Sequence, residues 1–196
     1  MMLMPTSALP PPPELAAGPD VLLRCPVVDD VDGMVEQCVD PETQRWISIP
    51  VPYTASDARE FVDRATQAWQ AGTVATFAIV YRGRFAGSLD LRMDGVGGAE
   101  VGFGLAPWAR GSGVMSRALR RVLAWAFDEL QLELVHWKAQ VGNWASRRTA
   151  TRCGFRVAGT VPGLLEHRGQ RCDGWFGLLR RGDPLTGDAD VEPAGG

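Results

Sequence analysis

Apolar and polar positions along the chain change period several times, which predicts helices and strands in alternation. Apolar residues at helical spacing mark four segments, and short runs rich in β-branched and aromatic residues separate them. The predicted helices are Asp29–Val39, Ala55–Gly72, Gly113–Leu130 and Trp144–Cys153. The predicted strands are Val21–Arg24, Thr76–Tyr81, Phe85–Met93, Ala99–Leu105, Leu134–Gln140, Arg156–Thr160 and Gly174–Leu179.

The order of these segments indicates the fold class. Arg82-Gly83-Arg84 and Asp94–Gly98 are predicted turns that join three consecutive strands into an antiparallel meander. A β-α-β-α-β order follows it. We therefore expect a single α+β domain with a mixed, mostly antiparallel sheet of about seven strands and about four helices.

Both ends of the chain differ in composition from this central part. Residues 1–20 hold no Lys or Arg and contain the run Pro10–Pro13, so we expect a flexible leader and not a secretory signal. Residues 182–196 are rich in Gly, Pro and Asp, which predicts a disordered acidic tail. The folded domain is expected to span residues 21–181.

Composition and charge exclude several classes of protein. The apolar content of 45% is that of a globular chain, and no apolar run approaches the roughly 18 residues that a membrane-spanning helix needs. The formal net charge of −3 argues against an extended nucleic-acid surface. It hides an asymmetry, because residues 21–101 carry −5 and residues 102–181 carry +8. We expect a small anionic ligand on the basic half and an amine on the acidic half.

The four cysteines are scattered and form no C-x-x-C pair. With only two histidines in the chain, a metal site is not expected, and reduced thiols in a cytoplasmic protein are the interpretation that we favour.

The glycine-rich stretch before the longest helix carries the clearest chemistry. Gly111 and Gly113 allow a tight turn, and the first N–H groups of the following helix are suited to a pyrophosphate, with Arg110 as an adjacent cation. A Walker loop is excluded, since the chain's only lysine is Lys138. A dinucleotide fingerprint fits poorly, since its third glycine position is Ser116. The alternatives left open are an acyl-CoA turn and a purely structural turn.

Several further motifs follow one another between residues 22 and 179. They are Leu23-Arg24, Tyr53-Thr54, Asp57-Ala58, Phe61-Val62, Trp69, Gly72, Phe77-Ala78-Ile79, Gly87, Ala99–Phe103, Asn143, Ser146, Cys153-Gly154-Phe155, Gly169, Asp173 and Leu178-Leu179. With these motifs in this order, the chain resembles the RimJ/RimL-like branch of the GNAT superfamily of acyltransferases. The glycine turn matches that family's Gln/Arg-x-x-Gly-x-Gly/Ala pattern, except that Met115 replaces the final small residue.

The resemblance implies a GNAT fold whose splayed central strands form an acyl-CoA cleft, with a β-bulge near residues 103–105. It assigns the binding of acetyl-CoA, or another short acyl-CoA, to these residues: Phe103, Leu105, Arg110, Gly111, Ser112, Gly113, Val114, Met115, Ser116, Asn143 and Ser146. One of Arg117, Arg120, Arg121, Arg147 and Arg148 is expected to hold the CoA 3′-phosphate.

The same resemblance implies direct attack of an amine on the thioester. Glu100 is the preferred general base, with Asp90 and Glu166 as lesser candidates. Ala150 stands where many family members have a tyrosine that protonates the departing thiolate, and Ser146 is expected to hydrogen-bond the CoA sulfur. A cap is an equally good interpretation of Asn143. His136 is expected to be structural and His167 to lie in a loop. Trp46, Tyr53 and Trp108 are candidates for the acceptor pocket or for the core.

We therefore expect an N-acetyltransferase that transfers acetyl from acetyl-CoA to a primary amine, such as a protein N-terminus, a small amine or an amino-antibiotic. A succinyl-CoA-dependent enzyme and a catalytically inactive CoA-binding module are the alternatives. No nucleic-acid or membrane partner is expected, and a homodimer is left open.

Overall fold

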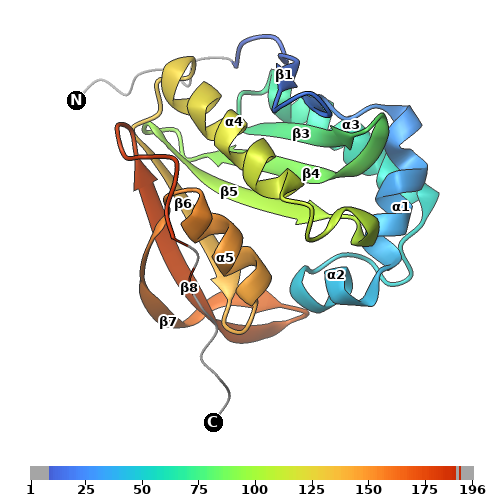
Figure 1. Cartoon of the computed structure of the whole chain (residues 1–196). Helices are drawn as coiled ribbons and strands as arrows, with labels where there is room; N and C mark the ends of the chain where they lie inside the picture. The colour runs from blue at the N-terminus through green and yellow to red at the C-terminus, as the bar shows by residue number, and fades with distance from the viewer. Residues whose placement is uncertain (1–8, 189, 191–196) are drawn as a thin grey trace.

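The computed structural model describes residues 9–188 and 190, which form one eight-stranded sheet with helices on both faces (Figure 1). The sheet order is β1-β2-β3-β4-β5-β6-β8-β7, and every neighbouring pair is antiparallel except β5 and β6. The strands are β1 Leu15–Ala16, β2 Val21–Arg24, β3 Val74–Tyr81, β4 Arg84–Met93, β5 Gly98–Leu105, β6 Leu134–Gln140, β7 Arg156–His167 and β8 Gln170–Arg180.

The α-helices are α1 Val31–Val39, α2 Pro41–Trp46, α3 Ala55–Gln70, α4 Val114–Asp128 and α5 Trp144–Arg152. Two 3₁₀ turns, Val28–Asp30 and Pro107–Ala109, precede α1 and α4. The predicted α+β class and mixed sheet are confirmed. The part of the chain that the structure describes has one strand more than we expected, because Leu15–Ala16 pairs with Leu22–Leu23, and one helix more, because Pro41–Trp46 is helical.

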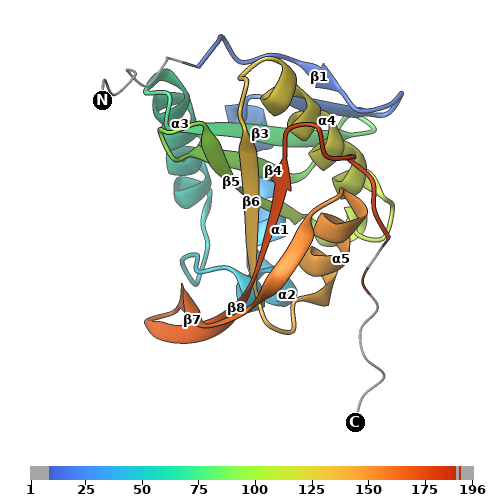
Figure 2. The ribbon, with the colours of Figure 1, turned by 90° about the vertical axis from the view of Figure 1, so that its left-hand side faces the viewer.

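Two apolar layers hold the helices to the sheet. The long helix α4 buries Val114, Ala118, Leu119 and Val122 against one face, and α1 and α3 cover part of the opposite face through Met34, Ala58 and Val62. Figure 2 shows α3 and α4 on opposite sides of the strands. On β5 and β6, the side chains of Glu100, His136 and Lys138 are only half-buried.

The expectation of a flexible leader over residues 1–20 is wrong for residues 9–20. Leu15 is buried, and the Trp69 indole donates a hydrogen bond of 2.7 Å to the Pro10 carbonyl. These residues are ordered because Leu15 and Ala17 add apolar surface to the core under α4. Residues 1–8 lie outside the described residues.

The predicted disordered tail also departs from expectation in its first part. The Leu185 carbonyl accepts a hydrogen bond from Arg120 at 2.9 Å, and Gly187 N–H donates to the Arg152 carbonyl at 3.3 Å. These contacts hold residues 185–187 against α4 and α5, so the folded unit extends past residue 181. Residues 189 and 191–196 lie outside the described residues.

Candidate functional site

The parallel pair β5 and β6 separates partway along its length. Its last paired residues are Val101 and Trp137, although β5 continues to Leu105 and β6 to Gln140. Each strand keeps its outer partner, since Leu105 still faces Gly87 of β4 and Gln140 still faces Gly174 of β8. The two strands therefore part while the rest of the sheet stays continuous, which is the splay that the sequence resemblance implies.

A cavity of about 310 Å³ lies at this separation. Successive residues of a strand point to opposite faces of the sheet. The cavity is lined by side chains from both faces, because Trp137 belongs to the core under α4 and its neighbour Lys138 points to the other face. The cavity therefore connects the α4 and α5 face with the open face. Its lining comprises Trp46, Ile47, Ser48, Arg92, Glu100, Val101, Gly102, Phe103, Trp137, Lys138, Ala139, Gln140, Asn143, Ser146, Leu165, Glu166 and His167.

Glu100 is the centre of a charged cluster on the open face. Its carboxylate lies 2.7 Å from Lys138 Nζ, 3.2 Å from His136 Nε2 and 3.7 Å from an Arg92 guanidinium nitrogen. The register explains this proximity, because Glu100 faces His136 on β6 and Arg92 on β4. The side chain of Glu100 is 27% exposed, so these contacts are only partly screened by water.

The cluster separates the pKa values of its two carboxylates. Burial alone would raise the pKa of Glu100, but the hydrogen bond from Lys138, together with Arg92 and His136, lowers the pKa below its usual value. Burial raises the pKa of Asp90, even though Arg92 lies 2.9 Å away and opposes the shift. The Glu100 carboxylate therefore stays charged to a lower pH than that of an isolated glutamate.

The amino end of α5 brings Asn143 and Ser146 to the cavity. The Asn143 side chain accepts a hydrogen bond from Ser146 N–H at 3.1 Å, so Asn143 is the N-cap of α5. The Trp137 indole donates to Ser146 Oγ at 3.0 Å. An indole N–H is only a donor, so Ser146 keeps its own hydroxyl proton for a further acceptor.

The glycine turn is open to solvent, whereas the two residues that follow it are not. Gly111 and Gly113 have φ values of +73° and +75°, a left-handed conformation that glycine adopts without strain. Residues 111–113 are exposed, and Gly113 is the N-cap of α4. Ser112 Oγ donates to the Ala109 carbonyl at 2.6 Å. An anion at this turn would meet the N–H groups at the amino end of α4.

Val114, Met115 and Ser116 differ in what they present to a ligand at the turn. The side chains of Val114 and Met115 are buried in the core, so only their backbone N–H groups are suited to binding. Met115, which departs from the family pattern, fills core volume. Ser116 is half-buried, and its carbonyl accepts a hydrogen bond from the Cys153 thiol at 3.5 Å.

Arg110 makes a protein contact that the sequence does not predict. Its guanidinium lies 2.5 Å from Asp40 Oδ2 and 2.9 Å from Thr43 Oγ1. Asp40 is the N-cap of α2, and its carboxylate also accepts the Thr43 N–H at 2.8 Å. The turn is thereby tied to α2, whose last residue, Trp46, lines the cavity.

The predicted β-bulge at residues 103–105 is wrong, because β5 pairs with β4 in regular register through Leu105. Glycine permits a close approach there instead, since a Cβ on Gly87 would lie 2.2 Å from the Gly104 carbonyl oxygen. Phe103 lines the cavity, and Leu105 packs on the core. Beyond Val101, the β5 edge that faced β6 has no strand partner among the described residues.

Of the three aromatic candidates for the acceptor pocket, only Trp46 lines the cavity. Gln140 donates to the Trp46 carbonyl at 3.2 Å. Tyr53 is buried beside Cys38, and burial raises the pKa of both groups, that of Cys38 to about 11. Trp108 stacks on Tyr81 with centroids 5.9 Å apart, away from the cavity lining.

Of the remaining candidate histidines and acids, His167 and Glu166 line the cavity, whereas His136 and Asp90 are not part of its lining. His136 contacts Glu100 and stacks on Phe176, while His167 lines the cavity with its Nδ1 3.3 Å from Ser48 Oγ. Glu166 lines the cavity too, and its carboxylate accepts the Gly169 N–H.

Most of the candidate arginines for a phosphate have protein partners. Arg117 lies 2.6 Å from Asp20, Arg147 lies 2.6 Å from Asp190, and Arg120 donates to the Arg152 and Leu185 carbonyls. Arg148 also makes a contact. The structure therefore singles out none of them for the 3′-phosphate.

Sequence reasoning did not find Lys138, Arg92 and Ser48 as site residues. Lys138 had one available signal, since it is the only lysine in a chain with 20 basic residues. Arg92 and Lys138 reach Glu100 only through strand register, which no local pattern reveals. The expected division of charge between the halves is not seen at the cavity, because Arg92, Glu100, Lys138 and Glu166 come from both halves and balance.

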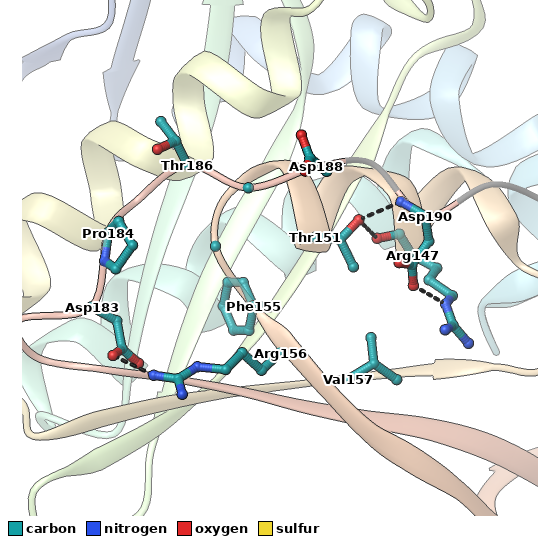
Figure 3. A pocket seen from close by; sticks show the side chains of 12 residues that line it. Arg147, Thr151, Phe155, Arg156, Val157, Asp183, Pro184, Thr186, Asp188 and Asp190 are labelled. Atoms are coloured by element: carbon teal, nitrogen blue, oxygen red, sulfur yellow. Dashed lines mark hydrogen bonds and ion pairs between the residues drawn. The ribbon is translucent and has the colours of Figure 1, made fainter.

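A second hollow of about 460 Å³ lies between α5, the start of β7 and residues 183–188 and 190 (Figure 3). Its side chains pair with one another: Arg156 lies 2.5 Å from Asp183, and Arg147 contacts Asp190. These pairs attach the C-terminal segment to the domain. The cavity at the strand separation remains the better candidate site, because it combines charged groups with unpaired strand edges.

Two other kinds of site are not seen. Within residues 9–188 and 190, no group of three or more His, Cys, Asp and Glu side chains could hold a metal ion. Among the helices of the same residues, none is long and apolar enough to cross a membrane.

Comparisons with known proteins agree on one family. A family model described as "Acetyltransferase (GNAT) domain" matches residues 20–156. A protein of Bacillus subtilis (strain 168) named "Putative ribosomal N-acetyltransferase YdaF" is 34% identical over 106 residues, 53% of this chain, and the match spans 58% of that relative's length. The "Uncharacterized N-acetyltransferase p20" of Bacillus licheniformis is 25% identical over 165 residues, which are 81% of this chain and 92% of that protein.

Solved structures share the fold at lower identity. RimL, a ribosomal L7/L12 alpha-N-protein acetyltransferase, superposes with a TM-score of 0.78 at 18% identity, covering 86% of this chain and 94% of that one. The microcin C7 self-immunity acetyltransferase MccE, solved with acetyl-CoA and AMP, gives a TM-score of 0.77 at 19% identity, covering 84% and 94%.

Proposed function

Because the chain belongs to the GNAT family of N-acetyltransferases, we propose that it transfers an acetyl group from acetyl-CoA to a primary amine by direct attack within a ternary complex. The observation that carries this proposal is the separation of β5 and β6 beyond Val101 and Trp137. Its cavity joins a thiol-side hydroxyl, Ser146, to an amine-side carboxylate, Glu100. We take residues 21–181 as the unit that performs the reaction, with residues 9–20 and 182–188 packed onto it.

Acetyl-CoA would occupy the face of the sheet that carries α4 and α5. The exposed turn Gly111–Gly113 and the N–H groups of Val114, Met115 and Ser116 would bind the pyrophosphate. The open β5 edge at Phe103 and Leu105 would pair with the pantetheine and polarise the thioester carbonyl. Asn143 would hold α5 in place at the edge of the cavity, and Arg110 would stabilise the turn from its position on Asp40.

The acceptor amine would enter from the open face and meet Glu100. An alkyl amine arrives as an ammonium at neutral pH and must lose a proton before it attacks the thioester. The charged Glu100 carboxylate would attract the ammonium and accept the proton, directly or through water. Ser146 would then donate a hydrogen bond from its free hydroxyl to the departing sulfur, since its oxygen already accepts the Trp137 indole N–H. The thiolate would take up one of the two protons that the ammonium loses, and the other would be released to water.

The acceptor that we favour is the α-amine of a protein N-terminus. RimL, which shares this fold, is described as an alpha-N-protein acetyltransferase, and YdaF is named as a ribosomal N-acetyltransferase. The cavity also suits a peptide, because two separate segments line it: Trp46–Ser48, at the end of α2 and just beyond it, and the β7 residues Leu165–His167. The balanced charges there do not demand a strongly cationic acceptor.

Thiol release from acetyl-CoA tests this proposal against a panel of amines. We expect peptides with a free α-amine to accelerate release, and the same peptides with an acetylated α-amine to have no effect. Small amines, an aminoglycoside and succinyl-CoA complete the panel of acceptors and donors. Glu100→Gln should lower kcat/KM by about 10²-fold or more, whereas Glu129→Gln, at an exposed carboxylate just after α4, should not. Acetyl-CoA binding without acceleration by any acceptor would contradict an enzyme and favour a binding module.

A further inference from the structure

Lys138 occupies an unusual place for the only side-chain amine in the chain. Nineteen of the 20 basic residues are arginines, and the single lysine lines the cavity at the strand separation. It lies on β6 one residue beyond Trp137, the last residue that pairs with β5. The side chain points to the same face as Glu100 and is 27% exposed, so its amine lies within the cavity and not on the outer surface.

The surroundings of Lys138 match what the proposed reaction requires of an acceptor. Its Nζ lies 2.7 Å from Glu100 Oε2, the carboxylate to which we assign the acceptance of the acceptor's proton. The cavity that it lines also contains Phe103, at the proposed thioester position, and Ser146, the proposed hydrogen-bond donor to sulfur. A lysine amine is a competent acyl acceptor once deprotonated, whereas arginine stays protonated in proteins.

From this placement we propose that Lys138 is a site of self-acetylation, in which the bound acyl thioester is the donor and the cavity lysine takes the place of the external amine. The inference rests on the proposed function, since it needs acetyl-CoA in the cleft. It assigns to this chain a covalent modification at a named side chain.

The chemistry balances without another reactant. Lys138 Nζ gives a proton to Glu100 and attacks the thioester carbonyl carbon. The new bond joins that carbon to Nζ, and the carbon–sulfur bond breaks as the thiolate leaves. One of the two protons lost from the ammonium is taken up by the thiolate, and the other is released to water. The products are Nε-acetyl-lysine and free CoA, with no oxidation or reduction.

Acetylation would change the cavity in two ways. It removes the positive charge that lies 2.7 Å from Glu100, leaving Arg92 as the cation of the cluster and His136 as a further contact of the carboxylate. It also adds an acetyl group to a cavity of about 310 Å³ at the point where the acceptor enters. Acetylation of Lys138 should therefore slow later turnovers. Self-acetylation would limit the activity of the enzyme when acetyl-CoA is abundant and acceptor is scarce.

The test incubates the full chain with acetyl-CoA without acceptor and follows the mass of the intact protein, with peptide mapping to locate each acetyl group. We expect one acetyl group on Lys138, at a rate that saturates with acetyl-CoA concentration. The rate should exceed that of Lys138 in the chain unfolded in denaturant by at least about tenfold, because the folded cavity holds amine and donor together. K138R should gain no acetyl group within the cavity.

Parallel titration of acetyl-CoA by calorimetry and thiol release with amine acceptors separate the possible failures. If acetyl-CoA binds and an external amine is acetylated while Lys138 stays unmodified, the self-acetylation proposal is overturned and the proposed function stands. If the folded and unfolded chains acetylate Lys138 at equal rates, the modification is chemical and the proposal is also overturned. If acetyl-CoA does not bind, both the proposed function and this inference fail.

Discussion

The Asp40 carboxylate binds both the N-terminus of α2 and Arg110 of the glycine turn, with Asp40 Oδ2 2.5 Å from the guanidinium and 2.8 Å from Thr43 N. In the reaction that we propose, acetyl-CoA would bind on one side of this contact and the acceptor amine on the other. The turn would hold the CoA pyrophosphate, and α2 ends at Trp46, which lines the cavity. The Asp40–Arg110 pair is therefore positioned to link donor binding to the acceptor wall.

Loss of this link should affect the acceptor more than the donor. Asp40→Ala removes the cap of α2, worth about 1 kcal/mol, so the acceptor KM should rise about fivefold while the KM for acetyl-CoA changes little. Asp63→Ala, an exposed carboxylate on α3, serves as the control in the same steady-state assays. A rise in the acetyl-CoA KM alone would show that Asp40 supports the turn and not the acceptor wall.

The ion pair between Arg24 and Asp30 makes a prediction about stability. The two guanidinium–carboxylate contacts measure 2.7 and 2.8 Å, and the Asp30 side chain is only 4% exposed. Asp30→Ala should lower the free energy of unfolding by about 3 kcal/mol, because it leaves Arg24 half-buried without its partner. Denaturant unfolding measures this loss.

Replacing both partners provides the control for that prediction. Arg24→Met combined with Asp30→Leu should recover most of the stability, because no buried charge is left without a partner. If Asp30→Ala alone unfolds within about 0.5 kcal/mol of the wild type, a size typical of surface substitutions, the pair does not stabilise the fold as its geometry indicates.

The Lys138–Glu100 contact makes a prediction about pH. Burial raises the pKa of Glu100, whereas its contacts with Lys138, Arg92 and His136 lower it. The net effect is a decrease, so the carboxylate stays charged well into the acidic range. Lys138→Met removes the strongest of the opposing cations, so the pKa should rise and the acidic limb of kcat/KM should move to higher pH. The limb should stay in place in Arg59→Met, which removes an exposed positive charge from α3.

The same contact contributes to stability with a defined sign. Because the pKa of Glu100 is lowered in the folded state, the contribution is present above the ordinary pKa of a glutamate. It is lost as the pH falls through the lowered value. An unchanged acidic limb in Lys138→Met would mean that a different group controls the acidic limb.

Local patterns predicted the elements of this fold well, since periodicity and glycine positions are local properties. Helix α4, the start of α3 at Thr54–Asp57 and the meander of β3, β4 and β5 illustrate this. Each lies close to its predicted range. The six-residue helix α2 was not predicted, because it is too short to show a helical period. Strand β1 was not predicted either, because its two residues are held by pairing and burial and not by propensity.

The site was only partly predictable for a different reason. The resemblance identified Glu100, Phe103, Asn143 and Ser146, and the structure brings all four to one cavity. The partners of Glu100 come from β4 and β6, and the partner of Arg110 comes from α2, at long sequence separations. Such contacts depend on register and packing, which one sequence does not encode in any short window.

Hydrogen–deuterium exchange with and without CoA is the most direct test of where the donor binds. The account predicts protection of backbone amides in peptides covering residues 102–116, the open β5 edge and the glycine turn, and residues 138–146, the end of β6 and the start of α5. It predicts little change in peptides covering residues 183–188 beside the second hollow. CoA binding with protection confined to that hollow, or with no protection at residues 102–116, would contradict the placement of the acyl-CoA cleft between β5 and β6.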